Sequence, residues 1–330
     1  MKAELKGQKV LVTGAGGFIG SRLADLLVQA GCQTRVFVRY TSRAEIGLLR
    51  YLPRPTLDSL EIIRGDLRDE DAVSKAAAGV DLIFHLGALI SIPYSYVHPV
   101  ETVQTNILGT LNVLQACREH GCRLIHTSSS EVYGTALYAP IDEAHPLQGQ
   151  SPYSASKIGA DKLVESYQRS FGVSAFTIRP FNTYGPGQST RAVIPTIISQ
   201  ALTQDIIQLG NLTAIRDFTY VDDTVSAFLL AAQAEDLEGE VINLGSGQEI
   251  SIAGLAALII SLVGRRVEIQ TDPQRLRPDN SEVMRLISNN SKAKSLINWA
   301  PTVSLESGLR QTIAWMRQHP ELYNASVYGV

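Results

Sequence analysis

Cysteine is scarce in this chain, and the few cysteines form no pattern. Among 330 residues there are three, Cys32, Cys117 and Cys122, an odd number without the spacing of metal ligands. The six histidines are scattered, so we assign no metal site. Unpaired thiols are typical of a reducing compartment, and the sequence therefore predicts a cytoplasmic setting.

The chain also lacks an excess of positive charge and a long apolar segment. Its net charge of −3 argues against a basic surface of the kind that binds nucleic acid. The longest apolar run, residues 254–264, is too short and too glycine-flanked to span a bilayer. The first ten residues lack the apolar stretch of a signal peptide. We therefore expect neither nucleic acid nor a membrane as a partner.

What the chain does have is a regular alternation of short apolar strands with helices. This alternation predicts an α/β fold with a Rossmann-type, doubly wound parallel sheet, whose ligands bind at the carboxyl ends of the strands. The expected strands are residues 10–13, 34–38, 60–66, 81–88, 123–128 and 174–180, and the expected helices begin at 18 or cover 68–79, 99–120 and 151–171.

The rhythm changes after Pro180, where turn residues accumulate. We expect two later strands, near 217–223 and 240–246, to return to the main sheet. The sequence therefore predicts a dinucleotide-binding domain and a smaller mixed α/β domain that binds the substrate. Their expected bounds are 1–180 plus about 218–248, and about 181–217 plus 249–330.

Glycine is concentrated where the first strand meets the first helix. TGAGGFIG, residues 13–20, places Gly14, Gly17 and Gly20 three residues apart. Such glycines let the chain turn tightly and let a pyrophosphate approach the amides of a helix N-terminus. A simple turn is the alternative. The position before an amphipathic helix, which opens with Phe18 and Ile19, favours dinucleotide binding.

Two arginines follow the second strand, where NAD-binding folds usually carry an acid for the ribose hydroxyls. Arg39 ends that strand, and Arg43 is close behind it. A guanidinium suits a 2′-phosphate, so the sequence favours NADP, with NAD as the alternative. A solvated arginine at a strand end is the simpler explanation of Arg39. Asp66, after the third strand, is placed either to reach the adenine or to cap a helix.

The segment SPYSASK supplies a tyrosine and a lysine four residues apart. Ser151 and Pro152 favour a helix start, which places Tyr153 and Lys157 on one helix face. A free phenol has a pKa of about 10, and an adjacent ammonium would favour the phenolate that acts as a base. Ser129, at the end of the fifth strand, could donate to the same substrate oxygen. The spacing alone is weak, but combined with the glycine loop it indicates a catalytic pair.

TGAGGFIG and YSASK together resemble the extended short-chain dehydrogenases/reductases that act on nucleotide sugars, and the resemblance runs nearly from end to end. It implies a homodimer formed by the helices near 99–120 and 152–171. It also implies that Ser129, Tyr153 and Lys157 are the catalytic hydroxyl, base and lysine. The cofactor-binding residues that it implies are Gly14, Gly17, Phe18, Ile19, Arg39, Arg43, Asp66, Leu67, Leu86, Ala88, Tyr153, Lys157 and Pro180.

The three residues before VYG distinguish reactions within that family. Ser129, Ser130 and Glu131 resemble the pattern of the 4,6-dehydratases, whereas the 4-epimerases generally lack the glutamate. Hexose dehydratases of the deoxythymidine type carry, in place of Ser130, an aspartate taken to protonate the departing hydroxyl. GDP-mannose dehydratases have serine there, so dehydration remains compatible. The proton donor would then be Glu131 or a water.

Longer stretches resemble one group of dehydratases. SIPYSY, RPFNTYGPGQS and RLRPDNSEV are similar to segments of the retaining N-acetylhexosamine 4,6-dehydratases that start from UDP- or GDP-N-acetylglucosamine. We therefore expect a nucleotide-activated amino sugar as substrate. The substrate-binding residues that the resemblance implies are Ser91, Tyr94, Asn182, Val193, Arg216 and Arg277.

The chemistry expected of these residues is redox-neutral overall. Tyr153 would take the proton of the C4 hydroxyl while hydride passes to the nicotinamide, and the resulting ketone would acidify the C5 hydrogen. Glu131 would remove that proton, water would leave across C5–C6, and hydride would return to C6. We expect His85 to be a satisfied supporting histidine and Tyr133 to pack in the core.

Two other interpretations stay open at this point. A nucleotide-sugar 4-epimerase or decarboxylase of the same fold is the first, and Glu131 argues against the epimerase. A regulator that binds the cofactor without catalysis is the second, and the intact Ser129, Tyr153 and Lys157 argue against it. The sequence names neither the nucleobase nor the exact sugar.

Overall fold

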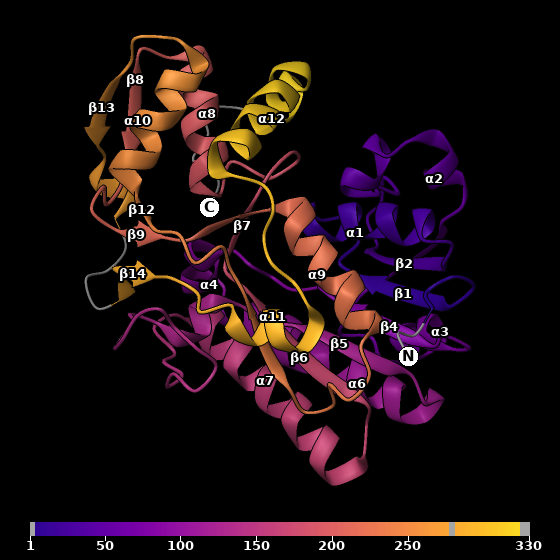
Figure 1. The fold of residues 1–330 in the computed structure, drawn as a ribbon. Coiled ribbons are helices and arrows are strands. Elements are labelled where there is room, and N and C mark those ends of the chain that lie inside the picture. The colour runs from indigo at the N-terminus through magenta and orange to yellow at the C-terminus, as the bar shows by residue number, and fades with distance from the viewer. Residues whose placement is uncertain (1–3, 277–280, 324–330) are drawn as a thin grey trace.

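A parallel sheet of seven strands forms the centre of the larger domain (Figure 1). The computed structural model describes residues 4–276 and 281–323. The strands of the sheet are β1 (Lys9–Thr13), β2 (Gln33–Arg39), β3 (Glu61–Gly65), β4 (Leu82–His85), β5 (Arg123–Thr127), β6 (Ala175–Pro180) and β11 (Val241–Leu244). Their order is β11-β6-β5-β4-β1-β2-β3, and every neighbouring pair is parallel. The predicted fold class is confirmed.

The strands are apolar on both faces because both faces are covered. Val10 and Val12 of β1 pack with Phe84 in one core, whereas Leu11 and Ile83 pack in the other. Alternate residues of one strand thus enter different cores, as the pleat requires. This double burial explains why the strands read as continuous apolar runs.

Two layers of helices provide the cover (Figure 1). One layer holds α1 (Phe18–Gln29), α9 (Val221–Gln233) and α11 (Ser291–Ile297), and the other holds α3 (Glu70–Ala77), α6 (Gly109–His120) and α7 (Pro152–Phe171). Within the layers α9 contacts α1 and α11, and α6 contacts α3 and α7. In the described parts of the chain, no helix combines the length and hydropathy needed to cross a membrane.

The helical stretch expected over 99–120 is interrupted by a π-helical turn. It consists of α5 (Pro99–Val103), the π-turn η2 (Gln104–Leu108) and then α6. The shorter elements of this domain are η1 (Gly47–Tyr51), α2 (Arg54–Asp58), α4 (Ile92–Val97) and η3 (Ser130–Tyr133). A π-turn inside a helix is uncommon and frequently marks a functional position.

Of the two later strands expected in the main sheet, one is there and one is not. Strand β11 pairs with β6, as predicted. The expectation for 217–223 is wrong, because β10 (Phe218–Tyr220) pairs instead with β7 (Asn182–Tyr184) in a separate two-stranded sheet. The rings of Tyr184 and Tyr220 pack edge to face at 5.6 Å, which anchors this pair, and β11 already occupies the edge beside β6.

The remaining elements form a smaller mixed α/β unit. They are α8 (Val193–Thr203), β8 (Ile206–Leu209), β9 (Ile215–Arg216), β12 (Ile250–Ser251), α10 (Ile252–Val263), β13 (Glu268–Thr271), η4 (Pro273–Arg275), β14 (Arg285–Leu286), α12 (Leu305–Gln318) and η6 (Pro320–Leu322). Their apolar residues join one of the two cores of the large sheet. The expected domain bounds stay a prediction. Helix α11, which lies within the range expected for the smaller domain, packs on α9 and β11.

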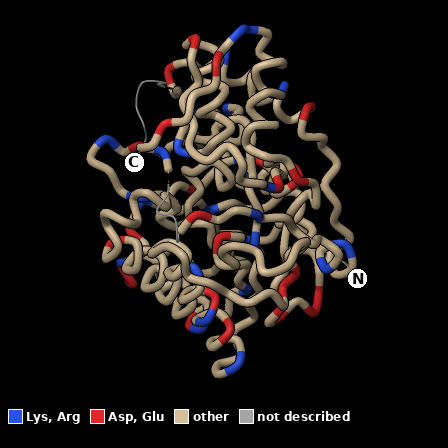
Figure 2. The backbone as a smooth tube through the Cα atoms, turned by 90° about the vertical axis from the view of Figure 1, so that its left-hand side faces the viewer, with Lys and Arg blue, Asp and Glu red and all other residues tan. Residues whose placement is uncertain are grey.

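Hydrogen bonds of Ser281 and Glu282 connect this unit to α4 and to the segment between β5 and α7. The hydroxyl of Ser281 lies 2.5 Å from that of Tyr96 and donates to the carbonyl of Gln150 at 2.6 Å. Thr135 donates to the carbonyl of Glu282. Acidic and basic positions are interspersed along the backbone (Figure 2), which agrees with the small net charge.

Candidate active site

The order of the strands places a crevice between β1 and β4, where the winding of the sheet reverses. Gly14 follows β1 with a φ of +70°, and Gly87 follows β4. A Cβ atom on Gly14 would lie 2.7 Å from the backbone nitrogen of Gly87, so no other residue fits there. The two loops thus meet backbone to backbone at the switch point.

The first turn of α1 faces this crevice with its backbone amides. Gly17 is the N-cap, and no side chain caps the helix. A Cβ on Gly20 would clash with the carbonyl of Gly14, so glycine is required for the close packing of loop and helix. These features fit a dinucleotide, whose pyrophosphate would lie against the amides of Phe18 and Ile19.

The predicted cofactor residues follow consecutive strands of the sheet at their carboxyl ends, and Tyr153 and Lys157 join them from the start of α7. This gathers the predicted set along one edge, as a doubly wound fold requires. The positions are Gly14, Gly17, Phe18 and Ile19 after β1, Arg39 and Arg43 at and after β2, Asp66 and Leu67 after β3, Leu86 and Ala88 after β4, and Pro180 at the end of β6.

The charged residues after β2 and β3 already have partners. Arg39 lies 3.5 Å from Glu101 of α5. Asp66 is bound by Arg68 at 2.6 Å, and this hydrogen bond lowers the pKa of the Asp66 carboxyl. The alternative that Asp66 caps the next helix is wrong, because Asp69 is the N-cap of α3.

Asn106, in the π-turn, fastens the loop after β4. Its side chain accepts from the amide of Leu89 at 2.7 Å and donates to the carbonyl of Leu89 and to Ser156 of α7. His85 is fully buried between the hydroxyls of Thr13 and Thr110, at 2.7 and 3.0 Å. The expectation of a satisfied supporting histidine agrees with these contacts.

The start of α7 is built by a capping box. Ser151 accepts from the amide of Ser154, whose hydroxyl accepts from the amide of Ser151. The predicted helix start is therefore confirmed. The ammonium of Lys157 donates to the carbonyl of Thr127 at 2.7 Å, and burial lowers the pKa of Lys157 to about 8.

The surroundings of Tyr153 favour the protonated phenol. Burial raises the pKa of Tyr153 to about 12, a hydrogen bond with Ser129 acts in the opposite direction, and the charge of Glu131 adds to the rise. The expected help from an adjacent ammonium is absent in the protein alone, because Lys157, with a pKa of about 8, is already neutral at the pH at which Tyr153 would ionise. Ser129 and Tyr153 are hydrogen-bonded to each other, so the two hydroxyls expected at the same substrate oxygen lie together.

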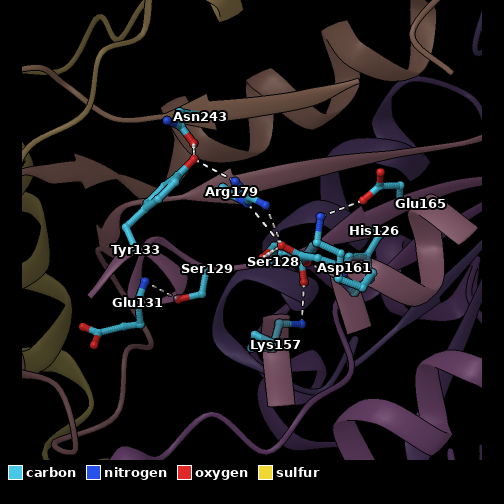
Figure 3. A network of polar contacts seen from close by, with 12 residues as sticks. His126, Ser128, Ser129, Glu131, Tyr133, Lys157, Asp161, Glu165, Arg179 and Asn243 are labelled. Carbon is cyan, nitrogen blue, oxygen red and sulfur yellow. Dashed lines mark hydrogen bonds and ion pairs between the residues drawn. The ribbon is translucent and has the colours of Figure 1, made fainter. Parts of the chain in front are cut away.

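The segment after β5 turns as a single 3₁₀ helix, η3. The hydroxyl of Ser129 accepts from the amide of Glu131 at 3.2 Å, and Ser130 is buried. The carboxylate of Glu131 points away from the buried residues Asp161 and Arg179 (Figure 3). Glu131 is thus a carboxylate of the catalytic strand end, next to Tyr153, and no part of the core.

A network of buried charges lies beside the predicted catalytic residues (Figure 3). Asp161, one turn after Lys157 on α7, accepts from Ser128 at 2.8 Å and from Arg179 at 2.9 Å. Burial alone would raise the pKa of Asp161, but His126, 3.3 Å away, and Arg179 hold it below its usual value. Burial in turn lowers the pKa of His126 to about 4, so this histidine is neutral.

The same network continues to the edge of the sheet. Arg179 donates to the hydroxyl of Tyr133 at 2.9 Å, and that hydroxyl donates to Asn243 of β11 at 2.8 Å. The Tyr133 side chain is fully buried, in agreement with the expectation that it packs. The amide of Asn243 donates to the carboxylate of Glu143 at 2.7 Å.

The predicted substrate residues lie on several elements. Ser91 caps α4 by accepting from the amide of Tyr94, and the amide group of Asn182 in β7 donates to the carbonyl of Asp217. Arg216 is buried, and its guanidinium lies 3.7 Å from Glu282. Val193 is the first residue of α8, and Arg277 lies outside the described residues.

Three parts of this site were not predicted from the sequence. They are the carbonyl of Thr127, the π-turn residue Asn106 and the buried Asp161. Asp161 had a detectable signal, because it lies four residues after Lys157 and shares its helix face. Asn106 is a polar residue on a buried part of a helix, but the sequence gives no sign of the π-turn that aims it.

Comparison with known proteins identifies the family of this chain. A model of the family described as GDP-mannose 4,6 dehydratase matches residues 11–312. The chain belongs to this family. Its members here are extended short-chain dehydrogenases/reductases, and the chain is 32% identical over 317 residues to the putative UDP-glucose 4-epimerase of Methanocaldococcus jannaschii, covering 94% of this chain and 99% of the relative.

Solved structures of family members superpose closely. The UDP-N-acetylglucosamine 4-epimerase of Methanobrevibacter ruminantium in complex with UDP-N-acetylmuramic acid is 30% identical, with a TM-score of 0.86, covering 95% of this chain and 99% of that one. The dTDP-glucose 4,6-dehydratase DesIV of Streptomyces venezuelae, with NAD and TYD bound, is 27% identical, with a TM-score of 0.85, covering 96% and 99%. The family thus includes both epimerases and dehydratases of nucleotide sugars that use a nicotinamide dinucleotide.

Proposed function

We propose that the chain is a nucleotide-sugar 4,6-dehydratase that converts UDP- or GDP-N-acetylglucosamine to its 4-keto-6-deoxy form. The carrying observation is the position of Glu131 beside the catalytic pair. Its charge is close enough to raise the pKa of Tyr153, and its amide is bound by Ser129. A carboxylate at that position would supply the base that is needed for elimination of water. Epimerisation at C4 does not need this base.

Tyr153 and Ser129 would act on the C4 hydroxyl. When bound, the nicotinamide ring would accept a hydride from C4 and later return it to C6. Tyr153 receives the C4 hydroxyl proton, with Ser129 as the hydrogen-bonding partner of both oxygens. Because the pKa of Tyr153 is raised to about 12 in the protein alone, activity requires positive charge nearby once the ligands are bound.

Lys157 would provide part of that positive charge from its position beside the end of β5. Its pKa of about 8 leaves the ammonium mostly protonated near neutral pH, and Thr127 holds it in place. Glu131 would then take the C5 proton, which the C4 ketone has made acidic. Glu131, now protonated, or a water would protonate the leaving C6 hydroxyl. As hydride returns to C6, C5 must regain a proton, and Tyr153, which holds the proton from the C4 hydroxyl, or a water would supply it.

We further propose that the cofactor is NADP, with Arg39 and Arg43 as partners of the 2′-phosphate. The last residue of β2 is an arginine at the position where an acid would favour NAD. The sugar nucleotide would lie against the smaller unit, formed by about 181–217 and 249–330. Asn182, Arg216 and Arg277 would hold its diphosphate.

We also propose that two copies of the chain associate through α5–η2–α6 and α7. Val100, Val103, Leu108 and Phe171 on these helices are between 41% and 67% exposed. A second copy would cover them. Sedimentation of the purified protein at several concentrations tests this, and a monomer at micromolar concentration would contradict it.

A 4-epimerase is the second candidate, because relatives with epimerase names match over almost the full chain. Mass spectrometry of UDP- and GDP-N-acetylglucosamine after incubation separates the two. A dehydratase yields a product lighter by one water without stoichiometric growth of reduced cofactor. A product of unchanged mass but altered configuration would instead assign an epimerase, and matched growth of reduced cofactor would assign a dehydrogenase.

A further inference from the structure

A cluster of charged side chains surrounds the end of β2, apart from the catalytic residues. It consists of Arg39, of Asp66 and Arg68 after β3, and of Glu101 on α5. One oxygen of the Glu101 carboxylate lies 3.5 Å from an Arg39 guanidinium nitrogen, and the other accepts a hydrogen bond of 2.5 Å from the hydroxyl of Tyr94 on α4. Asp66 is hydrogen-bonded by Arg68, and the charge of Arg39 also lowers its pKa, so Arg39 lies near both carboxylates and forms its ion pair with Glu101.

The surroundings of Glu101 keep it ionised. The hydrogen bond from Tyr94 and the charges of Arg39, Arg68 and His98 lower the pKa of the Glu101 carboxyl. The same hydrogen bond raises the pKa of the Tyr94 phenol. The Glu101 side chain is 26% exposed, against 63% for Arg39, so the carboxylate is the better fixed of the two partners.

We propose that Glu101 sets the choice between NADP and NAD. The proposal builds on the proposed function, in which Arg39 marks the 2′ position of the adenosine ribose. A 2′-phosphate carries nearly two negative charges, and at Arg39 it would meet the Glu101 carboxylate as a second, repelling neighbour. The 2′-hydroxyl of NAD, in contrast, can donate a hydrogen bond to that carboxylate. Glu101 thus takes the place of the acid that β2 lacks.

The test compares cofactor binding in the cofactor-stripped protein by calorimetry, with no substrate present. Glu101→Gln keeps the shape and removes the charge. The ratio of the Kd for NADP to the Kd for NAD should fall about tenfold, the effect of one close charge pair between the limits of bulk water and a protein surface. Raising the salt to about 0.5 M should shrink this change, because exposed charges are screened within a few ångströms.

Two further variants separate the role of this carboxylate from a general effect of charge. Glu306→Gln removes the same charge from α12, where Arg310 holds Glu306 at 2.7 Å, and should leave the ratio unchanged. Tyr94→Phe keeps the Glu101 carboxylate but removes its hydrogen bond. The ratio should then shift in the same direction as in Glu101→Gln, by a smaller factor. Thermal melting checks that each variant is folded.

The outcomes distinguish this proposal from the proposed NADP preference. A wild-type protein that binds NAD more tightly, with a Glu101→Gln variant shifted toward NADP, overturns the NADP preference and supports the role of Glu101. An unchanged ratio in a folded Glu101→Gln variant overturns the role of Glu101, whichever cofactor the wild type prefers. Equal weakening of both cofactors also overturns it, because that result assigns Glu101 a structural role only.

Discussion

Glu131 is the residue on which the proposed dehydration depends, because it would take the C5 proton. We expect Glu131→Gln to lower dehydration by about 10²–10⁴-fold, the usual contribution of a positioned base. Tyr153 and Ser129 act before the C5 step, so the variant should still reduce bound cofactor on mixing with substrate. Exchange of the C5 hydrogen with deuterium from solvent, followed by mass spectrometry, should be lost.

Tyr153→Phe is the informative comparison for that variant. It removes the group that takes the C4 hydroxyl proton, so cofactor reduction itself should be blocked. Near-wild-type dehydration by Glu131→Gln would contradict the proposed role and return Glu131 to an ordinary carboxylate of a loop, whose loss changes stability by less than about 0.5 kcal/mol.

Arg39 can be tested in the same way. Arg39→Ala removes the guanidinium proposed to bind the 2′-phosphate, and NADP binding should weaken by about 1.5–3 kcal/mol, the scale of a hydrogen bond to a charged group. NAD binding should change little. Arg54→Ala is the matched control, since Arg54 is 81% exposed and paired with Asp58 on α2. Equal affinity of wild type and Arg39→Ala for NADP would contradict the proposed role of Arg39.

At the residue scale, the spacing of residues in the sequence predicted the positions of some of these side chains. The positions of the others depend on how the buried elements pack. The four-residue step from Tyr153 to Lys157 is readable because a helix brings such residues to one face. The contact of Lys157 with the Thr127 carbonyl cannot be read from the sequence, because it depends on how α7 lies on β5. The pairing of Arg39 with Glu101 joins positions far apart in the sequence, and no local pattern signals it.

Among the elements, α7 is the one on which the catalytic pair depends. Ser151→Ala removes the capping hydroxyl and should lower the free energy of unfolding by about 1 kcal/mol. Because Tyr153 and Lys157 lie in the first two turns, kcat should fall by more than the fraction unfolded explains. Urea titration and steady-state kinetics measure the two effects, and Ser151→Asp, another good cap, should restore both.

The N-cap of α12 provides the control for this prediction. Ser304 accepts from the amide of Ser307 at 3.2 Å in a helix that carries no predicted catalytic residue. Ser304→Ala should cost a similar free energy of unfolding and leave kcat unchanged. If both variants lose the same fraction of kcat, the cap of α7 has no special link to catalysis.

Elements that are buried on both faces were the most predictable. The strands of the main sheet read as apolar runs because alternate residues enter two different cores. Strand β10 was placed in the wrong sheet because three residues, Phe218–Tyr220, carry too little pattern to identify a partner. The π-turn in Gln104–Leu108 is likewise set by the contacts of Asn106 and not by helix propensity.

At the scale of the whole molecule, buried charges connect elements that the apolar cores alone would leave independent. Asp161 and Arg179 join α7 to β6, and the hydrogen bonds of Tyr133 extend the network to β11. Breaking one partner of a buried pair leaves an uncompensated charge, which is strongly destabilising. The catalytic strand end is therefore held by a network whose charge state matters to the stability of the entire fold.

That dependence predicts loss of stability in mild acid. The pKa of His126 is about 4 in the folded chain and about 6.5 when unfolded, so the unfolded chain binds more protons between these values. Stability is therefore full above pH 6.5 and falls as the pH drops toward 4. At about 1.4 kcal/mol per pH unit, His126 accounts for about 3 kcal/mol of this loss. Burial also lowers the pKa of His85, and its effect has the same sign.

Urea titrations at several values between pH 7 and 4.5 measure the slope, and His126→Gln isolates the contribution of one residue. Glutamine retains a side-chain donor for Asp161 but cannot take up a proton in this range. The slope of unfolding free energy against pH should be shallower in the variant by up to the equivalent of one proton, about 1.4 kcal/mol per pH unit, and the remaining decline in this range reflects His85. Asp161, whose pKa is lowered from 3.8 on folding, adds to the loss only at lower pH. Equal slopes for the two proteins would mean that His126 does not titrate on unfolding, and the acid sensitivity would then have to come from other groups of the network.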